Sequence, residues 1–172
     1  MVLSCDSGNH IRTYNLPKVK EKNFTPSTIK KEIKPSGFIW EKPDSWTPSK
    51  GSSMRLASFA IPYSRGSGDL SVIQLGGTGG GIESNVNRWR QQLDLKSQSW
   101  NEIEKNLISM EGNLGKYSML QIINQKIDSA FLCAIIPTEN NTIFIKLSLR
   151  SVGITEVKDD FIKFCSSLNT LN

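Results

Sequence analysis

The chain has 172 residues, of which 37% are hydrophobic and 22% charged, and its formal net charge is +5. This length and composition favour one globular domain with a terminal tail, and such a domain can bury a core without metals or disulfides. The excess charge is local, because residues 1–36 hold seven Lys or Arg against three Asp or Glu, whereas residues 37–172 hold 14 against 13. A nucleic-acid-binding protein should carry its basic groups on the folded face, so nucleic acid is not the expected partner.

The start of the chain suggests a lipid anchor. Val2-Leu3-Ser4 precede Cys5, an order that resembles the end of a bacterial lipoprotein signal peptide, in which small and aliphatic residues precede a lipid-carrying Cys. Behind it, residues 6–36 are rich in Pro, Lys, Asn and Ser and poor in large apolar side chains, so they bury too little apolar surface to offset their ordering entropy. The alternative is a cytosolic chain with one stray Cys and a disordered arm.

Three segments follow from this pattern. Residues 1–5 are expected to be the remnant of a lipoprotein signal, residues 6–36 a disordered basic tether, and residues 37–172 a single α+β domain. A diacylated Cys5 would hold the protein at a membrane surface without spanning the bilayer. No run of about 18 apolar residues occurs in the sequence, so nothing in the chain itself is expected to cross a membrane.

Within residues 37–172 the hydrophobic periodicity predicts strands and helices in the order ββ-α-βββ-α. The expected strands are Arg55–Ile61 (ended by Pro62), Asp69–Leu75, Gly115–Ile123, Ala130–Ile136 and Thr142–Leu149, with a hairpin turn at Ser64–Gly68. The expected helices are Glu83–Leu95, a shorter one at Trp100–Leu107, and an amphipathic one at Thr155–Leu168.

These links predict the fold class. Hairpin-length connections imply antiparallel strands, and helices must cover at least one face of their sheet, which gives an α+β sandwich. Phe131–Ile136 is apolar on both faces and is expected to be the central strand. Trp40 and Trp46 flank a Pro-Asp turn and are expected to cover an open end of the core, or alternatively to line a ligand groove.

A glycine loop, Gly76–Gly81, joins a predicted strand to a predicted helix. It matches neither a dinucleotide fingerprint, whose third glycine would fall at Ile82, nor a P-loop, which needs Lys and Ser or Thr after its last glycine. Glycines allow close backbone approach and a helix start offers free N–H groups, so a small anion could bind here with help from Arg88. Against this, Glu83 in the first turn would satisfy the same helix dipole.

The helix that follows combines a buried stripe with polar edges. Val86, Trp89 and Leu93 recur at helical spacing, and Arg and Trp are common at interface hot spots. We therefore predict a partner or ligand surface made by Gly79, Gly80, Gly81, Asn85, Asn87, Arg88, Trp89, Arg90 and Gln92. The alternative is structural: Asn85 or Asn87 caps backbone in the loop, and an Arg pairs with a strand carboxylate.

The residues do not favour enzyme chemistry. The single histidine, His10, lies in the tether, so a Ser or Cys nucleophile in the folded part would have no His base. Cys133 and Cys165 lie far apart in sequence on apolar stretches, which predicts core residues rather than a metal site; if the protein is exported they could pair. We expect no enzyme, no cofactor and no metal, although a site built on Lys, Glu or Arg remains an alternative.

Three segments together carry a family resemblance. They are Trp40–Trp46, Ser53–Phe59, and Gly80-Gly81 with Asn85–Leu93. This combination resembles a group of uncharacterised bacterial lipoproteins that have a lipid-anchored Cys, a short tether and one domain. The closing pattern, Phe144–Leu147 and Phe161–Leu168, is similar to the ends of Mog1/PsbP/DcrB-like domains, which implies a binding or accessory module by analogy of fold.

The sequence therefore predicts a membrane-anchored bacterial lipoprotein of the cell envelope, facing the periplasm or exterior. Its domain would be a non-catalytic binding or accessory module whose partner is an envelope protein or small ligand. One alternative is a small anion- or ligand-binding domain that uses Gly76–Gly81 and the helix start. A second alternative is a cytoplasmic protein-binding module.

Overall fold

The computed structural model describes residues 37–77 and 81–171. Its elements, in chain order, are β1 (Phe38–Ile39), β2 (Thr47–Pro48), β3 (Arg55–Tyr63), β4 (Gly66–Gly76), α1 (Gly81–Gln92), α2 (Trp100–Glu104), β5 (Ile108–Gly112), β6 (Gly115–Asn124), the 3-10 turn η1 (Gln125–Ile127), β7 (Ser129–Pro137), β8 (Asn141–Leu149), the 3-10 turn η2 (Ser151–Gly153), α3 (Ile154–Ser167) and β9 (Asn169–Thr170). The predicted order is therefore present, with additional short strands.

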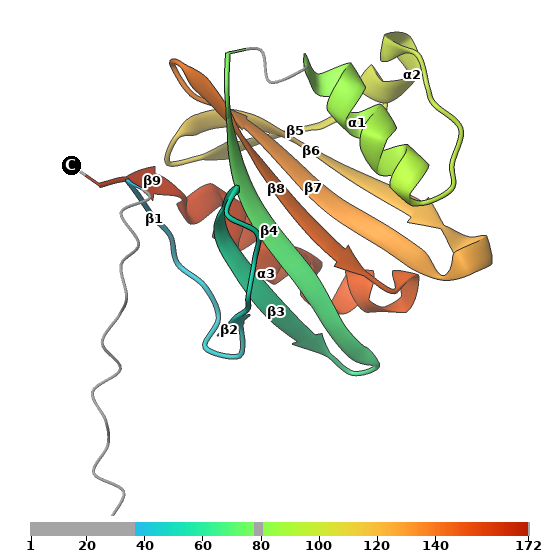
Figure 1. Cartoon of the computed structure of the whole chain (residues 1–172), viewed down its shortest axis with the longest axis horizontal. Coiled ribbons are helices and arrows are strands. Elements are labelled where there is room, and N and C mark those ends of the chain that lie inside the picture. The colour runs from blue at the N-terminus through green and yellow to red at the C-terminus, as the bar shows by residue number, and fades with distance from the viewer. Residues whose placement is uncertain (1–36, 78–80, 172) are drawn as a thin grey trace, which may run out of the picture. The chain divides into compact units, whose positions relative to one another are not determined.

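The central feature is a seven-stranded antiparallel sheet in the order β2-β3-β4-β8-β7-β6-β5. Hairpins join β3 to β4 and run from β5 through β8. The chain leaves the sheet after β4, forms α1 and α2, and returns at β5, and the meander then ends with β8 beside β4. In consequence, the two helices that follow the glycine loop lie against the later strands (Figure 1).

Helices cover both faces of the sheet (Figure 1). On one face, Phe161 and Phe164 of α3 pack with inward residues of the strands such as Leu70, Leu132 and Ile145, all nearly inaccessible to solvent. On the other face, α1 and α2 pack over β6, β7 and part of β8. Since β7 is covered on both sides, its residues from Ala130 onward are apolar, as expected of a strand without a solvent face.

An aromatic cluster closes the α3 side of the core. Trp46 is 2% exposed, and its ring lies 5.3 Å from that of Phe164 and 6.4 Å from that of Phe59. Trp40 packs on the same two phenylalanines, at 5.9 and 6.0 Å. Both tryptophans are therefore packing residues. Next to them, β1 pairs with β9, which fastens the start of the domain to its end.

Some boundaries differ from the sequence prediction. Strand β3 does not end before Pro62 but continues to Tyr63, with Pro62 opposite Ser67, and the hairpin turn shrinks to Ser64 and Arg65. Proline is tolerated there because β2 pairs only with Phe59 and Ala60, which leaves the outer side of β3 open beyond them. The central strand is β8 rather than β7, since β8 inserts between β4 and β7.

The short edge strand β5 was not predicted. Its sequence, Ile-Ser-Met-Glu-Gly, is brief and does not alternate cleanly, and Ile108 is 47% exposed. This segment forms a strand because it pairs with β6 and contacts α3. Its own sequence pattern does not predict a strand. Helix α1 also begins two residues earlier than expected, at Gly81, and ends at Gln92.

Candidate functional site

Helix α1 buries the stripe that its sequence predicts. Val86 and Trp89 are 1% and 6% exposed, and Leu93, just after the helix, is 2% exposed. The Trp89 ring meets Phe144 of β8 edge to face at 6.0 Å. Trp89 therefore belongs to the core on the α1 face and presents almost none of its ring to a partner.

Two polar residues of α1 hold the loop that leads to α2. The Asn87 side-chain amide donates to the carbonyl of Gln98 and accepts from its N–H, both at 2.8 Å. Arg90 donates through Nε to the Lys96 carbonyl at 2.7 Å. The predicted alternative had Asn85 or Asn87 capping backbone in the glycine loop. Asn87 bonds instead to backbone in the loop after α1, and it is Asn85 that bonds to the Gly81 carbonyl. The predicted pairing of Arg90 with a strand carboxylate is not seen, because the helix turns this side chain toward its own following loop.

The start of α1 is organised by Asn85, which is 3% exposed. Its Nδ2 donates to the Gly81 carbonyl at 2.8 Å, and its Oδ1 accepts from Arg88 at 3.3 Å. Gly81 has φ +73, a conformation that favours glycine, so it is suited to the junction between loop and helix. Arg88 is exposed and oriented by Asn85 rather than by a strand carboxylate. Glu83 lies in the first turn, as predicted.

Gln92 connects the end of α1 to the sheet. Its Oε1 accepts from Nζ of Lys146 in β8 at 2.6 Å, and the same Nζ lies 4.4 Å from the centre of the Phe131 ring. Burial lowers the pKa of Lys146, while the cation–π contact and the amide compensate its charge. Sequence reasoning missed Lys146, whose only signal was a lysine between the apolar residues Ile145 and Leu147.

The predicted surface thus divides into two groups. One group is buried in the domain or hydrogen-bonded to it, and consists of Asn85, Asn87, Trp89 and Arg90. The other group is exposed and consists of Arg88 and Gln92, with Gln91 between them. Gly79 and Gly80 lie outside the described residues, as does the predicted lipidation site Cys5 with the whole of residues 1–36. The exposed side of α1, formed by Arg88, Gln91 and Gln92, is therefore a polar ridge whose neighbouring side chains hydrogen-bond to the domain.

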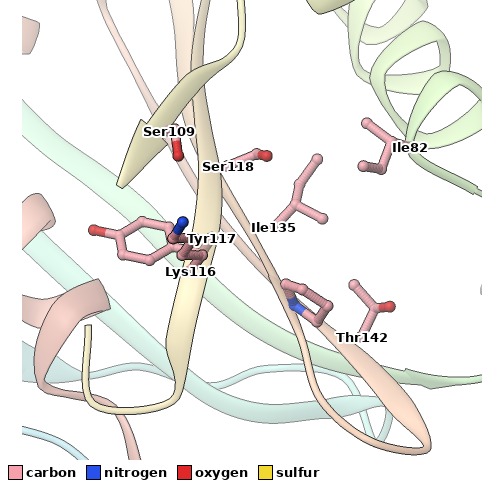
Figure 2. Close-up of a pocket in the computed structure, with 8 residues that line it drawn as sticks. Ile82, Ser109, Lys116, Tyr117, Ser118, Ile135 and Thr142 are labelled. Atoms are coloured by element: carbon pink, nitrogen blue, oxygen red, sulfur yellow. The ribbon is translucent and has the colours of Figure 1, made fainter. Parts of the chain in front are cut away.

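A shallow hollow of about 170 Å³ lies beside the first turn of α1. Figure 2 shows the side chains of Ile82, Ser118 and Ile135 directed toward it, with Thr142 at its rim. Tyr117 contributes backbone, because its ring points to the opposite face of the sheet and its hydroxyl is 3.0 Å from that of Ser166. The lining is mostly apolar, with Lys116 as a cationic group at the edge.

The two cysteines of the described domain lie on opposite faces of the sheet. Cys133, in β7, belongs to the core under α1, and Cys165, in α3, to the core on the other face. Both are free, and burial raises the pKa of each thiol. The sheet separates the two side chains, so they do not pair, and as protonated buried thiols they are inert core residues.

Three carboxylates of the described domain have lowered pKa values because they accept hydrogen bonds that stabilise the fold. Hydrogen bonds from Ser151, followed by Arg150, lower the pKa of Asp128, and hydrogen bonds from Ser64 lower that of Glu156. Backbone and side-chain hydrogen bonds from Ser99 lower the pKa of Glu102 in the same way. None of the three lines the hollow beside α1.

Neither a metal-binding cluster nor a membrane-spanning helix is found in the part of the chain that the structure describes. No group of three or more His, Cys, Asp or Glu side chains in residues 37–77 and 81–171 is arranged to hold a metal ion. Within the same ranges, no helix combines the length and the apolar character needed to cross a membrane.

Comparison with known proteins relates this chain by fold rather than by sequence. No protein-family model matches it, and no curated protein matches it in sequence. Among solved structures, it is similar to the cyanobacterial PsbP protein (CyanoP) of Synechocystis sp. PCC 6803, with a TM-score of 0.51 and 17% identity over 78% of this chain and 87% of that one. The chain therefore has a PsbP-like α+β fold, as its closing pattern predicted.

Two other structures overlap less well. A protein of Bacteroides thetaiotaomicron VPI-5482 gives a TM-score of 0.49 at 10% identity over 79% of this chain, which spans only 46% of that protein's length. LpqN, a protein involved in cell envelope biogenesis of Mycobacterium tuberculosis, gives 0.40 at 11% identity over 78% of this chain and 83% of that one. At these values the overlap adds nothing to the PsbP-like assignment.

Proposed function

We propose that this protein is a membrane-anchored lipoprotein of the bacterial cell envelope and that its domain is a non-catalytic binding or accessory module. The lipid would be attached to Cys5, and the segment up to residue 36 would serve as a tether. The anchoring rests on the sequence, through the small and aliphatic residues before Cys5 and the proline- and lysine-rich stretch behind it. The binding role rests on the geometry of α1.

The observation that carries the binding role is the preorganised ridge of α1. Asn87 and Arg90 fix the following loop, and Asn85 orients Arg88, so exposed polar groups are held in place before any partner arrives. Preorganisation reduces the ordering cost of association, and arginine is favoured in interface hot spots. The ridge is therefore suited to recognition of a protein partner through Arg88, Gln91 and Gln92.

The titratable groups support a non-catalytic role. An active site would place shifted pKa values together in a cleft. Here the carboxylates with lowered pKa values hold turns and helix caps. Lys146 is hydrogen-bonded to Gln92 and lies over the Phe131 ring, and it does not line the hollow beside α1. Hydrogen bonds are the largest cause of the lowered carboxylate pKa values and burial is the largest cause of the lowered Lys146 pKa, with neighbouring charges contributing less.

Anchoring is tested by intact mass and membrane fractionation of the protein expressed from its native upstream sequence. We expect a lipid-sized mass increment and membrane association, both lost in Cys5→Ser. An unlipidated, soluble wild-type product would contradict the anchor and favour the cytoplasmic protein-binding module.

The binding role is tested by photo-crosslinking in living cells with a photoreactive residue at position 91, on α1. Position 159, which is exposed on α3 over the other face of the sheet, is the matched control. We expect one discrete adduct from position 91 that disappears in Arg88→Ala and does not form from position 159. Equal labelling from both positions would contradict recognition by the ridge.

A second function is favoured by the hollow beside α1. Because it adjoins the helix start and has Lys116 at its edge, it suits the alternative of a small anion-binding domain. That function predicts saturable thermal stabilisation by a small anion, abolished in Lys116→Gln and unaffected in Lys126→Gln, an exposed lysine at a distant turn.

A further inference from the structure

Strand β5 forms one end of the seven-stranded sheet, and its outer edge has no neighbouring strand. Its residues Ile108, Ser109 and Glu111 are exposed. Within the part of the chain that the structure describes, the backbone of Ile108–Glu111 makes its hydrogen bonds to β6, and no other segment bonds to it. The N–H and C=O groups on the outer side of β5 are therefore available to a further strand.

The opposite end of the sheet is protected against such pairing. Strand β2 has two residues, one of which is Pro48, and proline has no N–H to donate. Where β2 leaves the outer side of β3 open, β3 carries Pro62. Strand β5 has five residues without a proline or a lysine, and its one charge, Glu111, lies opposite Lys116 of β6. Very short strands, prolines and lysines are the usual protection of sheet edges, so β5 is the edge that lacks it.

Helix α3 contacts β5 on one face of the sheet and leaves its edge free. A Cβ on Gly112 would meet the backbone of Ser166 at 2.8 Å, and in a strand the Cβ points out of the plane of the sheet. Met110, two residues earlier, packs against the same core as α3. An added strand would lie in the plane of the sheet, beside these contacts rather than across them.

The sequence of β5 is complementary to itself in an antiparallel arrangement centred on Met110. Side chains alternate along the strand, so Ile108 and Met110 face the α3 side, and Ser109 and Glu111 face the α1 side. In this register, Ser109 of each copy lies opposite Glu111 of the other, which places a hydroxyl donor beside a carboxylate acceptor. Ile108 lies opposite Gly112, whose lack of a side chain leaves room for it.

Other registers fit less well. A shift of two residues in one direction places Glu111 opposite Glu111 of the other copy, and like charges directly opposite destabilise a strand pair. The same shift in the other direction leaves only Ile108–Met110 of each β5 paired with the other β5. A slip of one residue brings the outward N–H and C=O groups of one strand opposite inward groups of the other, which breaks the hydrogen-bond pattern.

We propose that two copies of this chain associate through β5, which pairs with itself in antiparallel fashion about Met110 and joins the two sheets into one. The interface is isologous, because both copies use the same residues. Only five residues of each copy pair, so the contact belongs to the small interfaces below about 1,200 Å² and the dimer exchanges with the monomer. This association does not use the α1 ridge, and it is independent of the function proposed above.

The first test is disulfide trapping in the full chain with Cys5→Ser, where the remaining native thiols, Cys133 and Cys165, are both buried. Met110→Cys, oxidised with copper phenanthroline, should give a covalent dimer, because facing residues of antiparallel strands have Cα atoms about 4.5–5.5 Å apart, within disulfide range. Ser109→Cys is the matched control. Its two copies would lie diagonally, about 7–8 Å apart, and should give little dimer. No dimer from Met110→Cys, or equal amounts from both variants, would overturn the proposal.

The second test needs no new thiol. Sedimentation of the Cys5→Ser chain at up to about 1 mM protein should show a concentration-dependent dimer, a range that detects millimolar affinity. Ser109→Glu should weaken this dimer about tenfold, because it places two pairs of like charges across the interface, whereas Ser109→Lys, opposite Glu111, should preserve it. Ser109 is exposed, so both variants should keep the fold. A chain that sediments as a monomer throughout, or equal effects of the two substitutions, would contradict pairing through β5.

Discussion

At the scale of single residues, the polar positions of α1 show how a pattern that is typical of recognition surfaces can serve the structure of the domain. Asn87 uses its whole amide on the backbone of Gln98, and Arg90 uses one nitrogen on Lys96. The sequence left a partner surface and a structural use open as alternatives, and it identified neither of these acceptors. It could not choose between them, because the acceptors lie in a loop whose path depends on how α1 and α2 pack against β6.

Replacing Asn87 tests this structural use. In Asn87→Ala the N–H and carbonyl of Gln98 lose their partners, so we expect a loss of about 1–3 kcal/mol in the free energy of unfolding. Urea denaturation followed by tryptophan fluorescence measures it. Gln91→Ala, at an exposed position of the same helix, is the control and should change stability by less than about 0.5 kcal/mol. Equal effects of the two variants would contradict the assignment.

Asp128 gives a prediction about pH. Its carboxylate accepts from Ser151 and Arg150, which holds its pKa below the usual 3.8. A carboxyl with a depressed folded-state pKa contributes stability that is complete above the unfolded-state pKa and disappears as the pH falls through the folded-state value. Wild type should therefore be more stable than Asp128→Asn near neutral pH, and this advantage should shrink below about pH 3.8.

Melting temperatures of both proteins between pH 7 and pH 2 measure this difference. Asparagine suits the comparison because it tolerates the left-handed backbone of residue 128, where φ is 45. Glu102 and Glu156 titrate in both proteins, so their contributions cancel. A constant difference across the whole pH range would show that the carboxylate's charge is not responsible.

At the scale of elements, the long segments follow from periodicity and the short ones from their neighbours. Helix α3 has its predicted stripe, with Val157, Phe161 and Phe164 buried, because an amphipathic pattern is local information. Strands β1, β2, β5 and β9 have two to five residues each and exist through pairing. A pattern of that length carries too few positions to distinguish a strand from a loop.

The close approach of α3 to β5 depends on Gly112. A Cβ at this position would lie 2.8 Å from the backbone Cα and O of Ser166, which cannot move as a flexible side chain would. Gly112→Ala should therefore cost about 1–3 kcal/mol in the free energy of unfolding, measured by urea denaturation. Gly76→Ala is the control, since its Cβ would meet only Asn141 Oδ1 at 3.4 Å. A neutral Gly112→Ala would mean that α3 shifts freely.

At the scale of the whole molecule, the sheet separates two hydrophobic cores, and different groups of residues shield each core from solvent. The α1 face is closed by helices, and the α3 face needs the aromatic cluster of Trp40 and Trp46 in addition. The segment that carries these tryptophans precedes the sheet in sequence and yet packs against the last helix, α3, at Phe164. The two ends of the domain are therefore coupled through one core.

Truncating Trp46 should open that core. Trp46→Ala removes a side chain that is 2% exposed, and we expect a loss of about 3–5 kcal/mol, because a large cavity remains among Phe59 and Phe164. Thermal denaturation followed by circular dichroism measures the effect. Trp100→Ala, at a position that is 37% exposed, should cost far less. Similar losses in the two variants would argue against a special role for the aromatic cluster.

The α+β class, the antiparallel strands β3, β4, β6, β7 and β8, and the buried stripes of α1 and α3 could be predicted from the sequence, because they depend on the spacing of apolar residues along the chain. The sequence also supplied the grounds for a lipid anchor at Cys5, which lies outside the described residues and stays a prediction. The tertiary structure was needed to find that β8 is central, that Cys133 and Cys165 lie on opposite faces, and that Arg90 borders a hollow between α1, α2 and β6. These features depend on which segments pack against one another. Contacts between residues that are distant in sequence produce no periodic pattern along the chain, so the sequence alone does not predict them.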